Sequence, residues 1–127
     1  MSVIHHEIKL NASPERVYET LTNAEEFSKM SGAPAEINNE VGGFFSCFGG
    51  GVTGRNIELV PDKIIVQAWR GANWEEHDYS IVKYELKEQG SGTILVFNHT
   101  GYPEEMKDMI DTGWYKFYWD PMEKYFV

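Results

Sequence analysis

The residues with the most chemical potential are four histidines, one cysteine and a run of glycines, and their spacing favours no catalytic or metal-binding pattern. His5 and His6 are neighbours on a predicted strand, so their side chains point to opposite faces and cannot easily share an ion. His77 and His99 are far apart, and Cys47 has no second cysteine at metal-ligand spacing. No helix amino terminus follows Cys47 to lower the pKa of its thiol. We therefore expect no metal, no cofactor and no cysteine nucleophile.

The glycine-rich segment at residues 48–55, FGGGVTGR, shares only its glycine content with phosphate-binding loops. It lacks the Gly-Lys-Ser/Thr sequence and does not open a helix, so no helix dipole would point at a phosphate. Glycine adopts positive φ angles at little cost, which suits tight connections between strands. We expect Gly49, Gly50 and Gly51 to connect the two strands of a hairpin.

Trp74 lies in a predicted loop and is followed by the acid-rich segment EEHD at residues 75–78. One interpretation is a docking loop for a protein partner, with Trp74 as the anchor and the acidic side chains as the rim. The other is a solvated loop whose tryptophan folds back over the edge of the sheet, since large apolar side chains are seldom left exposed. The sequence leaves both interpretations open.

A set of aromatic residues on the middle strands and the last helix either lines a cavity for a small apolar ligand or fills the core. The set comprises Phe44, Trp69, Tyr84, Phe97, Trp114, Phe117 and Tyr118. The hydroxyl groups of Tyr84 and Tyr118 need partners if they are buried, so they are the candidate polar contacts of a ligand. No motif places an acid–base pair in this pocket, where polar residues such as His99 or Tyr84 would have to supply the chemistry. We expect no enzymatic activity.

The beginning of the chain predicts one strand and two short helices. Apolar residues alternate over residues 3–10, which indicates a half-buried strand. Ser13 is a good N-cap and Pro14 fits the first helical position, so a helix is expected over residues 14–21. Asn23 begins a second helix, since a glutamate three residues later can complete a capping box.

The middle of the chain predicts an antiparallel meander, because strand patterns and turn residues alternate at short spacing. The expected strands cover residues 44–48, 51–60, 64–70, 79–87 and 93–100. Proline presets the first central position of a type I turn, so such a turn is expected at residues 60–63, VPDK.

A long terminal helix is expected over residues 104–126, since apolar residues recur there at helical spacing. The apolar stripe comprises Met106, Met109, Ile110, Gly113, Trp114, Phe117 and Tyr118. Pro121 lacks the N–H group that an α-helix would use, so the helix should kink or restart there. Asp120 is the candidate cap of the restarted helix.

Length and charge limit the possible functions. The 127 residues are expected to form one domain over residues 1–127. Eleven basic and 20 acidic residues give a net charge of −9, which repels phosphate backbones and argues against a nucleic-acid partner. No apolar run suits a signal peptide or a membrane span, and a single cysteine allows no internal disulfide. We expect a cytoplasmic protein that does not enter membranes.

The order of strand, two short helices, meander and long terminal helix is similar to the helix-grip fold of the birch pollen allergen and START-type lipid-transfer domains. Within that superfamily (SRPBCC), the sequence most resembles the carboxy-terminal domain of the activator of heat-shock protein 90 ATPase. The matching segments are SPERVY at 13–18, GGF at 42–44, GVTG at 51–54, LVPDKIIV at 59–66 followed by Trp69-Arg70, and Gly113-Trp114 with Tyr118.

This resemblance implies an α+β fold in which a curved antiparallel sheet wraps around the long terminal helix. It also implies a non-enzymatic domain that binds heat-shock protein 90 and modulates its ATPase cycle. The full activator carries an upstream domain for which this chain has no room. The candidate contact residues are Arg55, Arg70 and Trp74. The alternative, from the wider superfamily, is a START-like protein that binds a small apolar ligand between the sheet and the helix.

Overall fold

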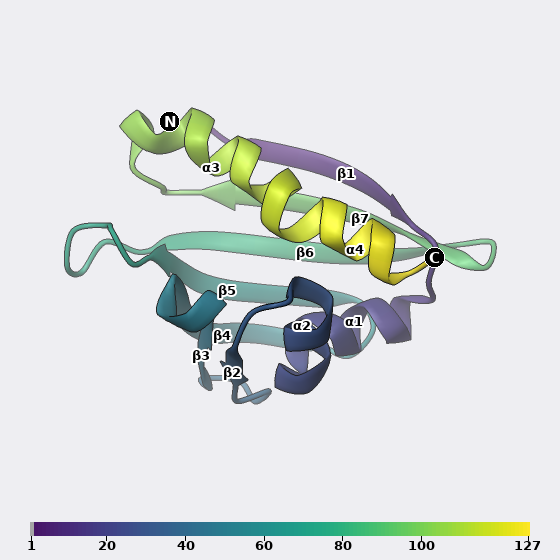
Figure 1. Ribbon diagram of the computed structural model, residues 1–127. Coiled ribbons are helices and arrows are strands. Elements are labelled where there is room, and N and C mark those ends of the chain that lie inside the picture. Colours follow the sequence, from purple (N-terminus) through teal and green to yellow (C-terminus); the bar gives the residue numbers. More distant parts are fainter. Residues whose placement is uncertain (1) are drawn as a thin grey trace.

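The computed structural model describes residues 2–127, which form a seven-stranded antiparallel sheet curved around a long C-terminal helix (Figure 1). The strand order across the sheet is β1-β7-β6-β5-β4-β3-β2. The strands are β1 (Ile4–Leu10), β2 (Ala35–Ile37), β3 (Phe44–Cys47), β4 (Val52–Val60), β5 (Ile64–Gly71), β6 (Ser80–Gln89) and β7 (Gly92–Thr100). The predicted helix-grip fold is confirmed.

The two short helices α1 (Pro14–Thr22) and α2 (Ala24–Ser31) begin at the predicted caps. The amide of Arg16 donates to Ser13 Oγ at 3.2 Å, and the amide of Glu26 donates to Asn23 Oδ1 at 3.0 Å. The second helix contacts the end of the terminal helix, where the Tyr125 hydroxyl donates to Glu26 Oε1. The capping signals therefore place two helices that support the last turns of the chain.

The connection from β3 to β4 agrees with the prediction, whereas the turn from β4 to β5 differs from it in type. A short 3₁₀ turn over Phe48–Gly50 joins β3 to β4, as the glycine run indicates. At residues 60–63 the amide of Lys63 donates to Val60 O, but Asp62 has a φ of +66°. A type I turn requires a negative φ at this position, so the type I prediction is wrong and the turn has the φ pattern of type II.

The terminal helix continues through Pro121 with helical angles, so the expected restart is wrong, and a π-helical turn lies directly before the proline. It runs as a 3₁₀ turn (Glu104–Met106), α3 (Lys107–Trp114), a π-helical turn (Tyr115–Trp119) and α4 (Asp120–Tyr125). Asp120 has helical angles (φ −63°, ψ −46°), and its amide donates to Tyr115 O, five residues earlier, so it is not a cap. The wider turn directly before the proline relieves the crowding that the ring would cause in a regular α-helix.

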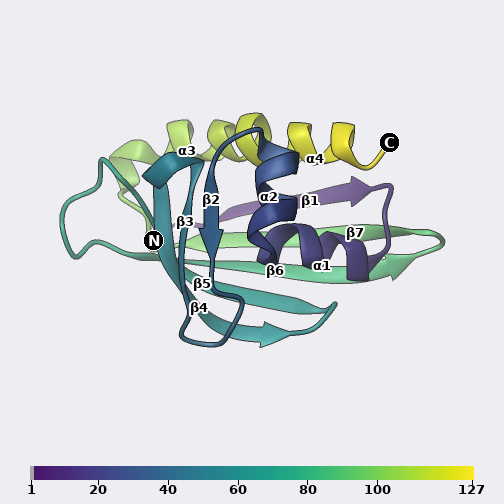
Figure 2. The same ribbon diagram turned by 60° about the horizontal axis from the view of Figure 1, so that its bottom comes forward.

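The helix covers one face of the sheet, here called the inner face, and no described element covers the other, outer face (Figure 2). Side chains alternate between the two faces along each strand, as in β6, where Val82 and Tyr84 are buried and Ile81 and Lys83 are exposed. The core forms between the inner face, α1, α2 and the terminal helix. No helix among residues 2–127 is both long and apolar enough to cross a membrane.

Candidate functional site

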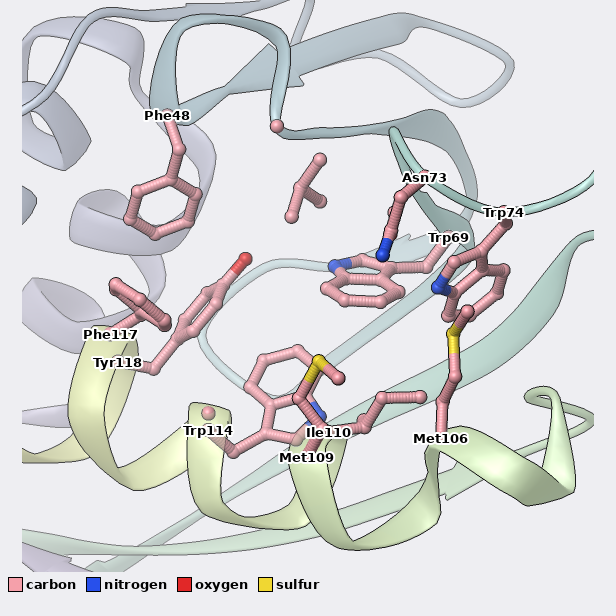
Figure 3. A pocket seen from close by; sticks show the side chains of 14 residues that line it. Phe48, Trp69, Asn73, Trp74, Met106, Met109, Ile110, Trp114, Phe117 and Tyr118 are labelled. Carbon is pink, nitrogen blue, oxygen red and sulfur yellow. The ribbon is translucent and has the colours of Figure 1, made fainter.

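A cavity of about 280 Å³ lies between α3 and the strands β4 and β5 (Figure 3). Its main lining side chains are Phe48, Val52, Trp69, Asn73, Trp74, Met106, Met109, Ile110, Trp114, Phe117 and Tyr118. Met109 and Phe117 are exposed to solvent and stand at its mouth. The apolar stripe predicted on the terminal helix thus faces a cavity over its whole length, in addition to packing on the core.

The structure divides the predicted aromatic set into three groups. Four members, Trp69, Trp114, Phe117 and Tyr118, line the cavity. Tyr84 and Phe97 lie deeper in the core; Phe97 packs against Trp114 with 4.2 Å between ring centroids, and neither residue lines the cavity. Phe44 is on the outer face and is 47% exposed, so its assignment to the cavity is corrected. Its neighbour Phe45 points inward instead, because adjacent strand residues face opposite sides.

Phe48 lines the cavity although the sequence pattern does not single it out. It lies in the 3₁₀ turn after β3 with a φ of +56°, where no strand or helix period applies. Its ring packs against Phe27, Phe117 and Tyr118. Only the glycines around it mark this turn, and they do not indicate the direction of the ring.

Trp74 folds back over the sheet, as the second interpretation of its loop predicts. It is 7% exposed, its ring packs against Trp69 with 5.6 Å between centroids, and it forms part of the cavity wall. Arg70 holds the loop in place: its Nη2 donates to Trp74 O and Glu75 O, and its Nε donates to Asp78 O. Neither side chain is therefore free to anchor a partner in this conformation.

Arg55 is the one of the three contact candidates that is exposed among the described residues. It lies on the outer face of β4, directly across from Phe44 of β3. The guanidinium lies over the Phe44 ring at 5.7 Å from the centroid, and its Nη1 donates to Gly42 O. This arrangement holds an aromatic ring and an arginine side by side at the surface.

Polar side-chain groups of Trp69, Asn73 and Tyr118 lie at the cavity wall (Figure 3). Trp69 Nε1 is buried and has no hydrogen-bond partner among residues 2–127. The hydroxyl of Tyr118 is directed into the same space. Burial raises the pKa of Tyr118, so the hydroxyl stays protonated at neutral pH. The Trp69 N–H faces this hydroxyl closely enough to oppose that shift, but the two groups do not form a hydrogen bond. The cavity wall thus carries three neutral side chains that can donate a hydrogen bond, and the Trp69 N–H is the buried one without a partner among residues 2–127.

A chain of hydrogen bonds fixes the cavity wall to the sheet. Trp114 Nε1 donates to His99 Nδ1 at 3.1 Å, His99 Nε2 donates to Ser80 Oγ at 2.7 Å, and Ser80 Oγ donates to Trp69 O at 2.7 Å. These bonds require a neutral His99 with its proton on Nε2. Burial lowers the pKa of His99 to about 3, so the imidazole is neutral near pH 7, as these bonds require.

Acid is expected to destabilise the protein through His99. The unfolded chain binds a proton at the ordinary pKa of 6.5, whereas the folded chain does so only near pH 3. The free energy of unfolding therefore keeps its full value above pH 6.5 and decreases as the pH falls towards 3. Linkage gives about 2 kcal/mol of lost unfolding free energy between pH 7 and pH 5. Urea unfolding at both pH values should show this loss, and His99→Gln should show a smaller one; equal losses would contradict it.

His6 forms a second buried link between the sheet and the helix. Trp119 Nε1 donates to His6 Nδ1 at 2.9 Å, and His6 Nε2 donates to Asp111 Oδ1 at 2.6 Å. As predicted, the two neighbouring histidines face opposite sides of β1, since His5 is exposed.

Burial raises the pKa of the Cys47 thiol to about 12. No group of three or more potential metal ligands gathers within the described part of the chain.

The family model described as "Activator of Hsp90 ATPase homolog 1-like protein" matches residues 11–127. The chain belongs to this family. The human "Activator of 90 kDa heat shock protein ATPase homolog 1" is 29% identical over 114 residues, which is 90% of this chain and 34% of the relative. The chain therefore spans about a third of the length of the curated relatives that it matches.

Solved structures show the same fold. An HSP90 activator from Plasmodium falciparum superposes with a TM-score of 0.90 at 26% identity, covering 97% of this chain and 94% of that one. The Aha1 dimer from Colwellia psychrerythraea has a TM-score of 0.80 at 24% identity, covering 97% of each chain, and supports the fold alone. The family takes its name from activating the ATPase of another protein, as the sequence resemblance indicates.

Proposed function

We propose that this chain binds heat-shock protein 90 and modulates its ATPase cycle as a co-chaperone-like domain. The observation that carries the proposal is the match to the HSP90 activator of P. falciparum over nearly the whole of both chains. Membership of the activator family supports it further. Because this chain corresponds to about a third of the human relative, binding is the first step to test.

The surface that we assign to this contact is the outer row, defined as Phe44, Arg55, Ala68 and Ile81. These residues lie side by side across β3, β4, β5 and β6 on the outer face of the sheet. Phe44, Arg55 and Ile81 are exposed, and the row joins apolar side chains to a guanidinium group. Aromatic and arginine side chains are the types that most often dominate binding at protein interfaces.

The proposed mechanism is a population shift in the chaperone. A bound domain favours one chaperone conformation only by as much as it binds that conformation more tightly than the others. Modulation of the ATPase therefore requires an affinity that depends on the nucleotide state of the chaperone.

The test is an NMR titration of the ¹⁵N-labelled chain with full-length heat-shock protein 90 from the source organism. The amide signals of the outer row should lose intensity first, and more strongly with a non-hydrolysable ATP analogue. Arg55→Glu should weaken binding at least roughly tenfold, the size expected for a central interface arginine. Lys124→Glu is the matched control, because it makes the same charge change on an exposed residue of α4.

Equal weakening by both variants would show that net charge, and not the outer row, controls binding. No change of any signal at high chaperone concentration would contradict the proposed function for this domain.

A second proposed function is the binding of a small apolar ligand. The cavity beneath α3 and the unpaired Trp69 N–H at its wall favour it. This site lies on the inner side of the sheet, so the two functions use different surfaces of the domain.

A further inference from the structure

We infer that the cavity selects a flat, uncharged molecule carrying a hydrogen-bond acceptor, and that Trp69 Nε1 donates to this acceptor. The inference rests on the second proposed function and names the class of ligand for it. It assigns the specificity of the site to one indole N–H group at the cavity wall.

The unpaired donor is the first observation behind the inference. Nearly all buried polar groups in folded proteins have a hydrogen-bond partner, and a buried donor without one carries a desolvation penalty. Trp69 Nε1 is buried and has no such partner in residues 2–127. Figure 3 shows this nitrogen directed into the cavity near the Tyr118 hydroxyl. An acceptor atom of a ligand in that space would remove the penalty.

The cavity lining excludes a charged ligand. None of the lining residues that the structure describes is Asp, Glu, Lys, Arg or His. A carboxylate or phosphate would therefore lose its hydration without gaining a counter-charge. Aromatic cages also bind quaternary ammonium groups, but such a group offers no acceptor and would leave the Trp69 donor unpaired.

The arrangement of the rings favours a flat ligand of compact size. The Trp69 and Trp114 rings pack against each other, with 5.1 Å between centroids and 33° between planes, and Trp74 packs edge-on against Trp69. The three rings form an aromatic wall on which a flat ligand can stack. The hydrogen bond to His99 holds the Trp114 ring in position, and the bonds onward through Ser80 tie it to the backbone carbonyl of Trp69. The volume of about 280 Å³ lies just below the usual range for drug-sized ligands, so the cavity has room for a molecule about the size of a fused bicyclic ring system.

Three bicyclic probes of similar size separate the requirements. Chromone is neutral and carries a carbonyl acceptor, naphthalene is neutral without an acceptor, and 2-naphthoate is an anion. Each is titrated into the ¹⁵N-labelled full chain while the indole N–H signals of its four tryptophans are followed. Chromone should move the Trp69 signal downfield and bind roughly 3- to 10-fold more tightly than naphthalene, as expected for one neutral hydrogen bond.

Two variants assign the effect to one indole group. Trp69→Phe removes the donor while keeping an aromatic ring, so chromone and naphthalene should then bind with similar affinity. Trp74→Phe is the matched control, because it removes another indole from the cavity wall and should keep the preference for chromone. The comparison of probes on the unmodified chain stands even if Trp69→Phe folds poorly.

The outcomes separate the inference from the function on which it rests. Equal binding of chromone and naphthalene, with the Trp69 signal unmoved, would overturn the assigned donor while leaving a ligand cavity in place. Binding of 2-naphthoate as tight as that of chromone would overturn the requirement for an uncharged ligand. No binding of any probe would remove the ligand-binding function together with the inference.

Discussion

Replacing Gly54 by alanine is expected to lower the free energy of unfolding by about 3 kcal/mol or more. Gly54 lies on the inner face of β4, between Phe45 of β3 and Trp69 of β5. A Cβ atom there would overlap the carbonyl oxygen of Ala68 and come within 2.6 Å of Phe45 Cζ. A clash with backbone cannot be relieved by turning a side chain, so the strands would have to separate.

Urea unfolding followed by tryptophan fluorescence measures this effect. Gly113→Ala is the control, since its Cβ atom would meet nothing closer than Phe117 Cδ2 at 3.8 Å. Alanine is favoured over glycine inside a helix, so this variant should be slightly stabilised, by about 0.5–1 kcal/mol. An unfolding midpoint of Gly54→Ala close to that of the unmodified chain would show that the sheet can absorb a methyl group at this position.

Trp119→Ala is expected to cost about 3–5 kcal/mol, the range for truncating a large buried aromatic side chain. Trp119 is 0% exposed, and its ring packs against Phe97 and Trp114. Its loss also leaves the buried nitrogen Nδ1 of His6 without its donor. The substitution therefore combines a cavity in the core with an unpaired polar atom.

Phe117→Ala is the comparison for this prediction, because it truncates an aromatic residue in the same π-helical turn. Phe117 is 49% exposed at the cavity mouth, so its loss should cost less than about 1 kcal/mol. Thermal unfolding of the two variants measures the difference. Equal costs would contradict the assignment of Trp119 to the core and Phe117 to the surface.

The local signals of the sequence predicted the helices and turns where one or two residues determine the geometry. Ser13, Pro14 and Asn23 place the starts of α1 and α2 through contacts within four residues. The turn at residues 60–63 was placed correctly, but its type was wrong, because aspartate tolerates the positive φ that Asp62 adopts. The backbone angles of such a turn depend on the twist of the strands on either side.

The candidate site was less predictable, since it depends on contacts distant in sequence. A shift of one residue along β3 exchanges Phe44 for Phe45, and the apolar segment FFSCF gives no clear alternation to choose between them. Trp119 was missed because a regular helical period assigns the inner face to Tyr118 and Met122. The unpaired donor of Trp69 appears only when β5, the loop after it and α3 are assembled.

The π-helical turn inserts one extra residue between the two halves of the terminal helix, α3 and α4. One residue corresponds to about 100° of rotation in an α-helix, so the insertion sets α3 and α4 in different rotational phases. From the end of the turn onward, Trp119, Met122 and Phe126 pack into the core, while α3 directs its side chains to the cavity. Substitutions in α3 can therefore change the shape of the cavity during evolution while α4 keeps its contacts with the core.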